Sequence, residues 1–214
     1  MRKSYSCLQI SLLQIPFGLV AAGHRRREDQ MPNSSYDVIR DVGETLRSVL
    51  EDAIRDTLEV SVKLEAPKKI EETGDQNTLY VFLYRIEENA DLKNLPPLTS
   101  NGNVVRRQPF DLHFMLTPNS KEEKDALRLL GRAMQALLEK SILLGADLQG
   151  SRDGTAEQLR ISMNPLTQET ITQIWQALEA PMRIAAFYLV TPVFIESEPQ
   201  PEAERVRERE ARAF

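Results

Sequence analysis

The sequence predicts an α/β (α+β) fold in a single domain, with a mixed β-sheet of about four to five strands flanked by three helices. Segments with apolar residues at every second position alternate with segments whose apolar residues recur every three or four positions. Turn-forming residues separate these segments. The chain has 214 residues, of which 41% are hydrophobic and 28% are charged, which is typical of one ordinary domain with a buried core.

The first expected element is a long amphipathic helix that begins just after Ser34 and Ser35. Its apolar residues follow helical spacing, and charged residues fill the opposite face. The pattern predicts about twenty residues, or roughly 30 Å of helix. We interpret the apolar face as core packing. It is formed by Ile39, Val42, Leu46, Val49, Leu50, Ala53 and Ile54.

Two strands should follow this helix. Residues 57–64 alternate apolar and polar side chains, which indicates a half-buried strand. Residues 78–86 are dense in β-branched and aromatic side chains, so both faces of this strand should be covered at its centre. Residues 87–108 are rich in turn formers and predict a loop, and loops of about this length are usually functional or flexible.

A third strand should span residues 110–117, opened by Pro109. Its apolar residues share one face, and His113 falls on the other, where we interpret it as a surface or partner-facing histidine. The apolar face of the strand is formed by Phe110, Leu112, Phe114 and Leu116.

A helix should follow this strand. Ser120 and Glu123 fit a capping box at its start, and it should end near Lys140. The expected inward residues of the helix are Ala126, Leu127, Leu130, Ala133, Met134, Leu137 and Leu138.

The rest of the body predicts a short strand at residues 159–163, a helix at 168–179 and a final strand at 182–196. The segment ending at Thr167 should cap that helix. Pro192 implies that the final strand lies at an edge of the sheet or bends.

The chain divides into three parts by composition. Residues 1–30 are a doubtful N-terminal extension, for which a mis-assigned start before Met31, a signal peptide and a genuine surface-anchoring tail all remain open. Residues 31–197 form the expected domain, and residues 198–214 form a charged flexible tail. Residues 1–30 are basic, so the chain's formal charge of -5 becomes about -8 for the remainder.

Nothing in the sequence points to an enzyme. The phosphate-binding loop, dinucleotide-binding turn, zinc-protease helix and nucleophile elbow motifs are all missing. One cysteine, Cys7, and two histidines, His24 and His113, give little material for a metal centre. An acidic chain is also a poor binder of nucleic acid. We therefore expect no catalytic residues, cofactor or metal, no nucleic acid and no direct membrane insertion.

Four segments resemble the cap, or tail-terminator, proteins of phage-tail-like extracellular contractile injection systems. They are residues 35–46 (SYDVIRDVGETL), 110–118 (FDLHFMLTP), 126–138 (ALRLLGRAMQALL) and 165–197. The strand that carries Asp111, Leu112 and His113 is the most specific, followed by the run from Trp175 through Arg183 to Tyr188. The resemblance covers roughly residues 34–197.

The resemblance implies a tail-terminator-like fold and a structural protein that caps the distal end of the inner tube and sheath. It implies a homo-hexameric ring that ends tube growth, with the tube protein and the sheath protein as partners. The protein would be cytoplasmic during assembly and then part of a particle that is released or membrane-anchored.

A ring needs two different patches on each subunit. We expect the loop, the final strand and the tail after Ser197 to supply them, with Pro96, Pro97, Arg106, Arg107, Pro192 and Phe194 as interface residues. The alternative is a monomeric protein-binding adaptor that uses an exposed sheet edge. A third class, a secreted or lipid-associated protein, depends on residues 1–30 alone.

Overall fold

The computed structural model describes residues 35–55, 60–67, 77–145, 147–150 and 158–202. All of these residues belong to one unit of the chain, Pro32–Phe214. The expectations for residues 1–30 lie outside the described residues, as do those for residues 203–214 of the tail.

The described residues contain three α-helices, as expected. A 3-10 turn, η1 (Ser35–Asp37), leads into α1 (Val38–Ile54), and α2 (Glu123–Glu139) and α3 (Gln168–Ala177) follow later in the chain. Thr167 caps α3 as predicted, because its hydroxyl accepts a hydrogen bond from the Thr170 amide at 3.3 Å.

The main sheet has six strands in the order β1-β2-β5-β8-β7-β6. Only β1 and β2 run parallel, so the sheet is mixed, as expected. It has more strands than the sequence suggested, because the short segment after α2, for which no strand was predicted, forms the edge strand β6. The strands are β1 (Val60–Lys63), β2 (Asn77–Glu88), β5 (Arg107–Asn119), β6 (Ile142–Leu144), β7 (Gln158–Met163) and β8 (Ala186–Glu196).

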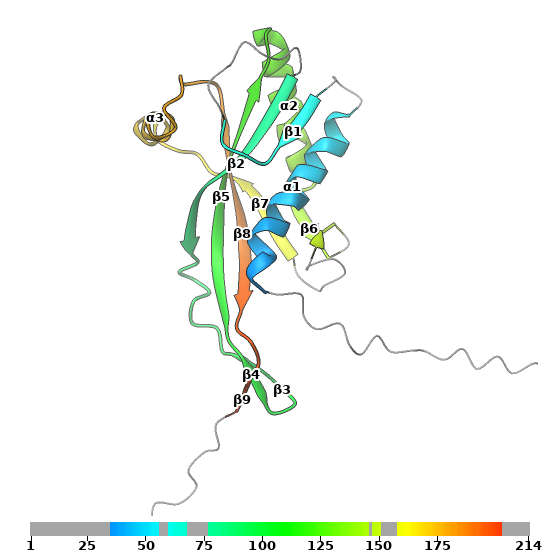
Figure 1. Ribbon diagram of the computed structural model, residues 1–214, viewed down its shortest axis with the longest axis vertical. Coiled ribbons are helices and arrows are strands. Elements are labelled where there is room, and N and C mark those ends of the chain that lie inside the picture. Colours follow the sequence, from blue (N-terminus) through cyan, green and yellow to red (C-terminus); the bar gives the residue numbers. More distant parts are fainter. Residues whose placement is uncertain (1–34, 56–59, 68–76, 146, 151–157, 203–214) are drawn as a thin grey trace, which may run out of the picture. The chain divides into compact units, whose positions relative to one another are not determined.

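Helices cover the two faces of the sheet unequally (Figure 1). The main core lies between one face and helices α1 and α2, and it includes Leu46, Leu112, Phe114 and Leu137. The predicted apolar face of β5 is thereby confirmed. A smaller core on the other face joins Met115 and Phe187 to Trp175 of α3, with Ile171, Ile174 and Leu178 packed around it.

The predicted loop at residues 87–108 is wrong in its second half. Leu98–Ser100 (β3) and Asn103–Val105 (β4) form a hairpin, and Gln200–Pro201 (β9), expected in the flexible tail, pair with β4. Asn101 and Gly102 both have positive φ, 51° and 74°, as a two-residue type I′ hairpin turn requires. The turn formers that suggested a loop therefore mark the tip of a hairpin.

Two details of α2 also differ from the prediction. The helix is not started by a capping box, because Glu122 is the N-cap and the Ser120 hydroxyl accepts instead from the Glu122 amide at 3.3 Å. Leu127 and Leu138, expected to face inward, are 47% and 76% exposed. Their positions on the helix point well away from the face that buries Leu129, Ala133 and Leu137, so their apolar character did not indicate burial.

The final strand is shorter than expected and is not a simple edge strand. Residues 182–185 precede it, and β8 lies between β5 and β7 over Tyr188–Thr191. Pro192 does mark an irregularity, because the β5–β8 register shifts there and the Thr191–Pro192 peptide is cis. Beyond Pro192 the strand pairs with β5 alone among the described residues.

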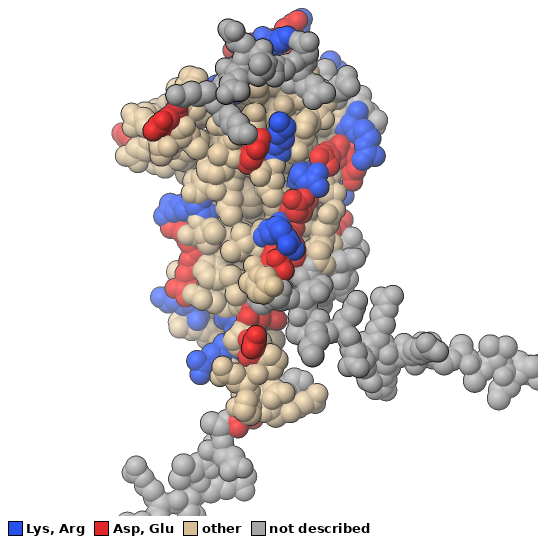
Figure 2. Space-filling model, viewed as in Figure 1, with Lys and Arg blue, Asp and Glu red and all other residues tan. Residues whose placement is uncertain are grey.

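The outer face of α1 carries acidic and basic side chains in turn along the helix (Figure 2). Arg47 binds Glu44 at 2.7 Å and Glu51 at 2.6 Å, which raises the pKa of its guanidinium. Ion pairs at this spacing are worth only about 0.3–0.5 kcal/mol each on a helix surface. The face is therefore a solvated surface that neutralises itself, and packing of the opposite face stabilises the helix.

The segment before Gly150 is fastened to α1. The Thr45 hydroxyl donates to the Asp41 carbonyl at 2.7 Å and accepts from the Gln149 amide at 3.0 Å. Gly150 has a φ of +66°, and a Cβ added there would lie 2.5 Å from the buried Asp41 carboxyl carbon. A side chain at position 150 would therefore strain the backbone and displace a buried carboxylate.

We predict that Gly150→Ala lowers the free energy of unfolding by about 1–3 kcal/mol, through backbone strain and the clash with Asp41. Gly131→Ala is the matched control, because a Cβ there meets nothing within 4 Å. It should raise the free energy of unfolding by about 0.5–1 kcal/mol by favouring α2. Urea unfolding of both variants measures the difference, and equal shifts would contradict the assigned contact.

Candidate assembly interface

The sequence-predicted interface residues lie at or near the end of the sheet where β5 and β8 extend to the small β3-β4-β9 sheet (Figure 1). Arg107 opens β5 opposite Glu196, and Phe194 of β8 is opposite Pro109. The Arg107 guanidinium carbon lies 5.1 Å from the centre of the Phe194 ring, within cation–π range. This pair joins the two strands beyond the helices.

Arg106 lies in the one-residue break between β4 and β5, and its side chain is exposed. Its backbone amide donates to the Ser197 hydroxyl at 3.0 Å, and its carbonyl accepts from the Ser197 amide at 2.8 Å. The Glu202 amide also donates to the Gly102 carbonyl at 2.8 Å. These bonds hold residues 197–202 against the hairpin and leave the Arg106 guanidinium directed to solvent.

Pro96 and Pro97 are exposed and lie just before β3, the strand that flanks β4 on the side away from β9. Pro192 is half-buried at the irregularity in β8, two positions before Phe194. The structure thus gathers Arg106, Arg107 and Phe194 at the paired ends of β5 and β8. It places the prolines in the segments that enter this end. We call the β3-β4-β9 sheet with the paired ends of β5 and β8 the distal arm.

An asparagine that the sequence did not single out anchors the segment leading into the distal arm. The Asn89 amide donates to Asp111 at 2.9 Å and to the Thr191 hydroxyl at 3.2 Å, and Thr191 also bonds Asp111. Its carbonyl oxygen accepts from the Asp91 and Leu92 amides at 3.1 and 3.0 Å. One side chain therefore closes the turn after β2 and ties it to both β5 and β8. The only signal in the sequence was its place among turn formers.

The prediction that His113 is a surface or partner-facing histidine is wrong, because its exposed fraction is 7%. Nε2 lies 3.1 Å from a Glu87 carboxylate oxygen, and Nδ1 lies 3.0 Å from the Asn164 amide nitrogen. With that amide as the donor, Nδ1 accepts and Nε2–H donates to Glu87. The centres of the Tyr84 ring and the His113 imidazole are 5.9 Å apart. Burial raises the pKa of the Tyr84 hydroxyl.

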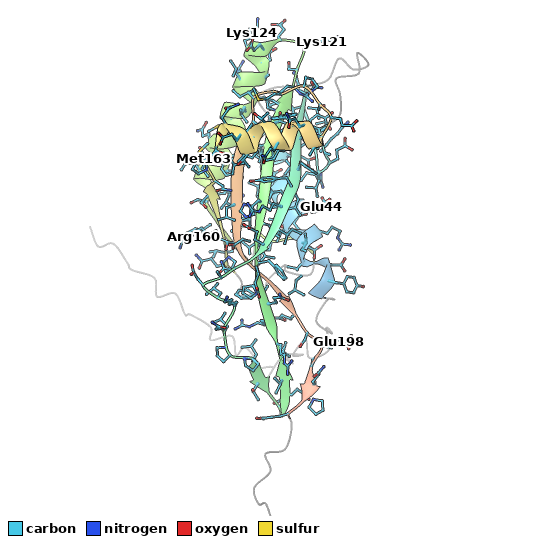
Figure 3. The ribbon with its side chains drawn as sticks, turned by 90° about the vertical axis from the view of Figure 1, so that its left-hand side faces the viewer. Glu44, Lys121, Lys124, Arg160, Met163 and Glu198 are labelled. Atoms are coloured by element: carbon cyan, nitrogen blue, oxygen red, sulfur yellow. The ribbon has the colours of Figure 1, made fainter. Side chains whose placement is uncertain are left out.

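The remaining residues of the two most specific segments also have structural roles. The Thr117 hydroxyl donates to the Ile184 carbonyl at 3.0 Å. The Arg183 guanidinium lies over the Trp175 ring at 5.6 Å and donates to Asn119 at 3.1 Å, and burial lowers the pKa of Arg183. These contacts fasten α3 and the chain after it to the sheet, and Figure 3 shows α3 lying across the strands.

The described residues contain no group of three or more histidine, cysteine, aspartate or glutamate side chains placed to hold a metal ion. Within the same residues, every helix is too short or too polar to cross a membrane.

The family model described as the Pvc16 N-terminal domain matches residues 41–209. None of the curated protein sequences matches the chain. Several solved structures share its fold, including the following two. The sheath/tube terminator of an extracellular contractile injection system, PVC, in the extended state matches with a TM-score of 0.60 at 17% identity. The tube-terminating cap of the anti-feeding prophage, AFP, matches with a TM-score of 0.51 at 17% identity.

Both matches involve most of this chain but only part of the other protein. They cover 82% of this chain and 63% of the PVC terminator, and 83% of this chain and 61% of the AFP cap. The chain thus spans less than two thirds of the length of either. The terminator-like fold expected from the sequence is confirmed.

The hairpin of the distal arm can be weakened without touching the core. Gly102→Val places a β-branched residue at a φ of +74°, with nothing within 4 Å of the new Cβ. This costs roughly 1–2 kcal/mol, so amide exchange in β3 and β4 should become about tenfold faster while β5 keeps its protection. Gly102→Asn, which tolerates positive φ, should exchange like the wild type. Equal exchange in both variants, measured by mass spectrometry, would contradict the assigned turn.

Proposed function

Because the chain belongs to the Pvc16 N-terminal domain family, we propose that it is a structural assembly protein of a contractile injection particle. In this role it caps the distal end of the inner tube and sheath and ends tube growth as a ring. The observation that carries the proposal is the agreement between the family match and the two fold matches, one named a sheath/tube terminator and the other a tube-terminating cap.

The distal arm and the sheet edges supply the kinds of surface that a ring needs. A cyclic ring joins two different patches of neighbouring subunits. The distal arm extends past α1 and α2, and the side chains of Arg106 within it and of Pro96 just before it are exposed. We assign the subunit and tube contacts to this arm and to the segments that enter it, with Pro96, Pro97, Arg106, Arg107, Pro192 and Phe194 as the contact residues.

The partners in this proposal are further copies of the chain, in a homo-hexamer, together with the inner tube protein and the sheath protein. Assembly takes place in the cytoplasm, and the finished particle is released or anchored at a membrane. The role consists of stopping polymerisation by occupying the tube end, so it requires no catalytic residue, cofactor or metal.

Imaging separates this proposal from the alternative of a monomeric adaptor, for which the structure does offer an exposed sheet edge on β2. The full chain is mixed with growing tube protein and examined by native mass spectrometry and electron microscopy. A cap gives closed rings at tube ends and shorter tubes. A chain that stays monomeric and leaves tube length unchanged would overturn the proposal and favour the adaptor.

Charge reversal in the distal arm tests the assigned contact residues. The double variant Arg106→Glu, Arg107→Glu should abolish ring formation and tube association, because it replaces two cations at the contact. The control variant Lys124→Glu, Arg128→Glu reverses two exposed charges on α2 and should assemble normally. Circular dichroism checks that both variants fold. Normal assembly of the arm variant would remove the distal arm from the interface.

A further inference from the structure

Among the described residues, β1 pairs with only a third of the outer edge of β2. β1 pairs with Asn77–Tyr80 and stops at Lys63, whereas β2 continues to Glu88. In an antiparallel pair, alternate residues direct their N–H and C=O groups away from the partner strand. From Val81 to Glu88 these outward groups have no hydrogen-bond partner among the described residues. The second half of β2 lies at the outside of the sheet in Figure 1.

The opposite edge of the same sheet is closed at Leu144 of β6. The Leu144 amide of β6 donates to the Asp147 carboxylate at 3.2 Å, and the Leu144 carbonyl accepts from the Asp147 amide at 2.7 Å. Both outward backbone groups of Leu144 are thereby satisfied within the chain. Native sheets block edges in this way to prevent unwanted pairing, so the open edge of β2 contrasts with an edge that the fold does protect.

A groove lies beside the open edge of β2. Its volume is about 290 Å³, and its apolar lining comes from α1, from the chain just after β1 and from the sheet. Sites for drug-sized molecules usually range from about 300 to 1,000 Å³, so this groove is of the size for one or two large side chains. Its lining residues include Ile39, Gly43, Leu64, Val81, Leu83 and Phe114.

The edge beyond the groove has one apolar face and one charged face. Ile86 pairs with Leu112, whose side chain lies in the core under α1, and Ile86 is 45% exposed. Arg85 and Glu87 pair with His113 and Asp111 on the α3 face, and they form an ion pair with each other. A strand added here would meet apolar surface on the α1 side and charges on the α3 side.

We propose that the β2 edge from Val81 to Glu88 receives an extended polypeptide segment of a different protein. The segment carries large apolar side chains on the face toward α1, one of them in the groove, and polar side chains on the other face. Strand addition of this kind gains affinity from main-chain hydrogen bonds and specificity from pockets for alternate side chains.

The symmetry of a ring, which rests on the proposed function, argues against a second copy as the occupant. Pairing of two β2 edges would be isologous and would close a two-fold dimer. Pairing of β2 with β6 is opposed by Asp147, which already occupies the outward groups of Leu144. The segment is therefore contributed by another protein of the particle, and the distal arm is left to hold the ring.

Two isoleucines give a matched pair for the test. Ile86 of β2 and Ile142 of β6 both lie in strands and are both 45% exposed. The experiment uses the full chain, with tube protein and sheath protein added separately and together. Amide exchange of residues 81–88 is followed by mass spectrometry, and association is followed by sedimentation for the wild type, Ile86→Asp and Ile142→Asp.

We expect at least one of the added proteins to slow exchange at residues 81–88 by about tenfold or more. Ile86→Asp should weaken association with that protein by about tenfold or more, because it places a charge against the apolar face of the segment. Ile142→Asp should bind as the wild type does.

Three outcomes would overturn the inference. Exchange at residues 81–88 is unchanged when both proteins are bound, or both variants lose affinity equally. Alternatively, the purified chain alone protects residues 81–88 in a concentration-dependent manner, which would make a second copy the occupant. In each case normal capping of tubes would leave the proposed function standing, whereas a wild-type chain that binds neither protein would overturn both.

Discussion

The central strand β5 is the constraint on which the rest of the structure depends. It pairs with β2 on one side and β8 on the other along most of its thirteen residues. Its apolar side chains fill the core under α1 and α2, while Asp111, His113 and Thr117 on the other face bond to three separate segments. Asp111, His113 and Thr117 are thus each bonded to the chain that they hold in place, and removal of either partner would leave the other without its hydrogen bond.

This arrangement places the most recognisable residues of the sequence inside the fold. Both ring nitrogens of His113 are hydrogen-bonded, to Glu87 and Asn164, and Trp175 is buried in the smaller core with the Arg183 guanidinium over its ring. These residues therefore stabilise the fold, and the fold is what the chain shares with its family. The surfaces proposed for assembly rely on backbone edges, exposed side chains and the shape of a groove, for which many residue types serve equally well.

The sequence was sufficient to predict the three helices, the positions of the main strands, the apolar face of β5 and the cap at Thr167, because these depend on local periodicity. It failed where distant segments decide the outcome. The hairpin at residues 98–105 is completed by β9 from nearly a hundred residues away, and the burial of His113 depends on Asn164 and Glu87. Of the candidate interface, the sequence located residues near the distal arm but not the open edge of β2, which exists only because β1 is short.

The two edges of the main sheet limit unwanted strand pairing in different ways. An exposed strand edge is a hazard, since it pairs with any suitable strand. Here β6 is closed by Asp147, and the polar face of the β2 edge carries Arg85 and Glu87, whose charges oppose a wholly apolar strand. A segment that is apolar on one side and polar on the other satisfies both faces at once. Selectivity at this edge then has two sources. The amphipathic segment makes favourable contacts on both faces, and a strand of another pattern places apolar side chains against charges or polar side chains against apolar surface.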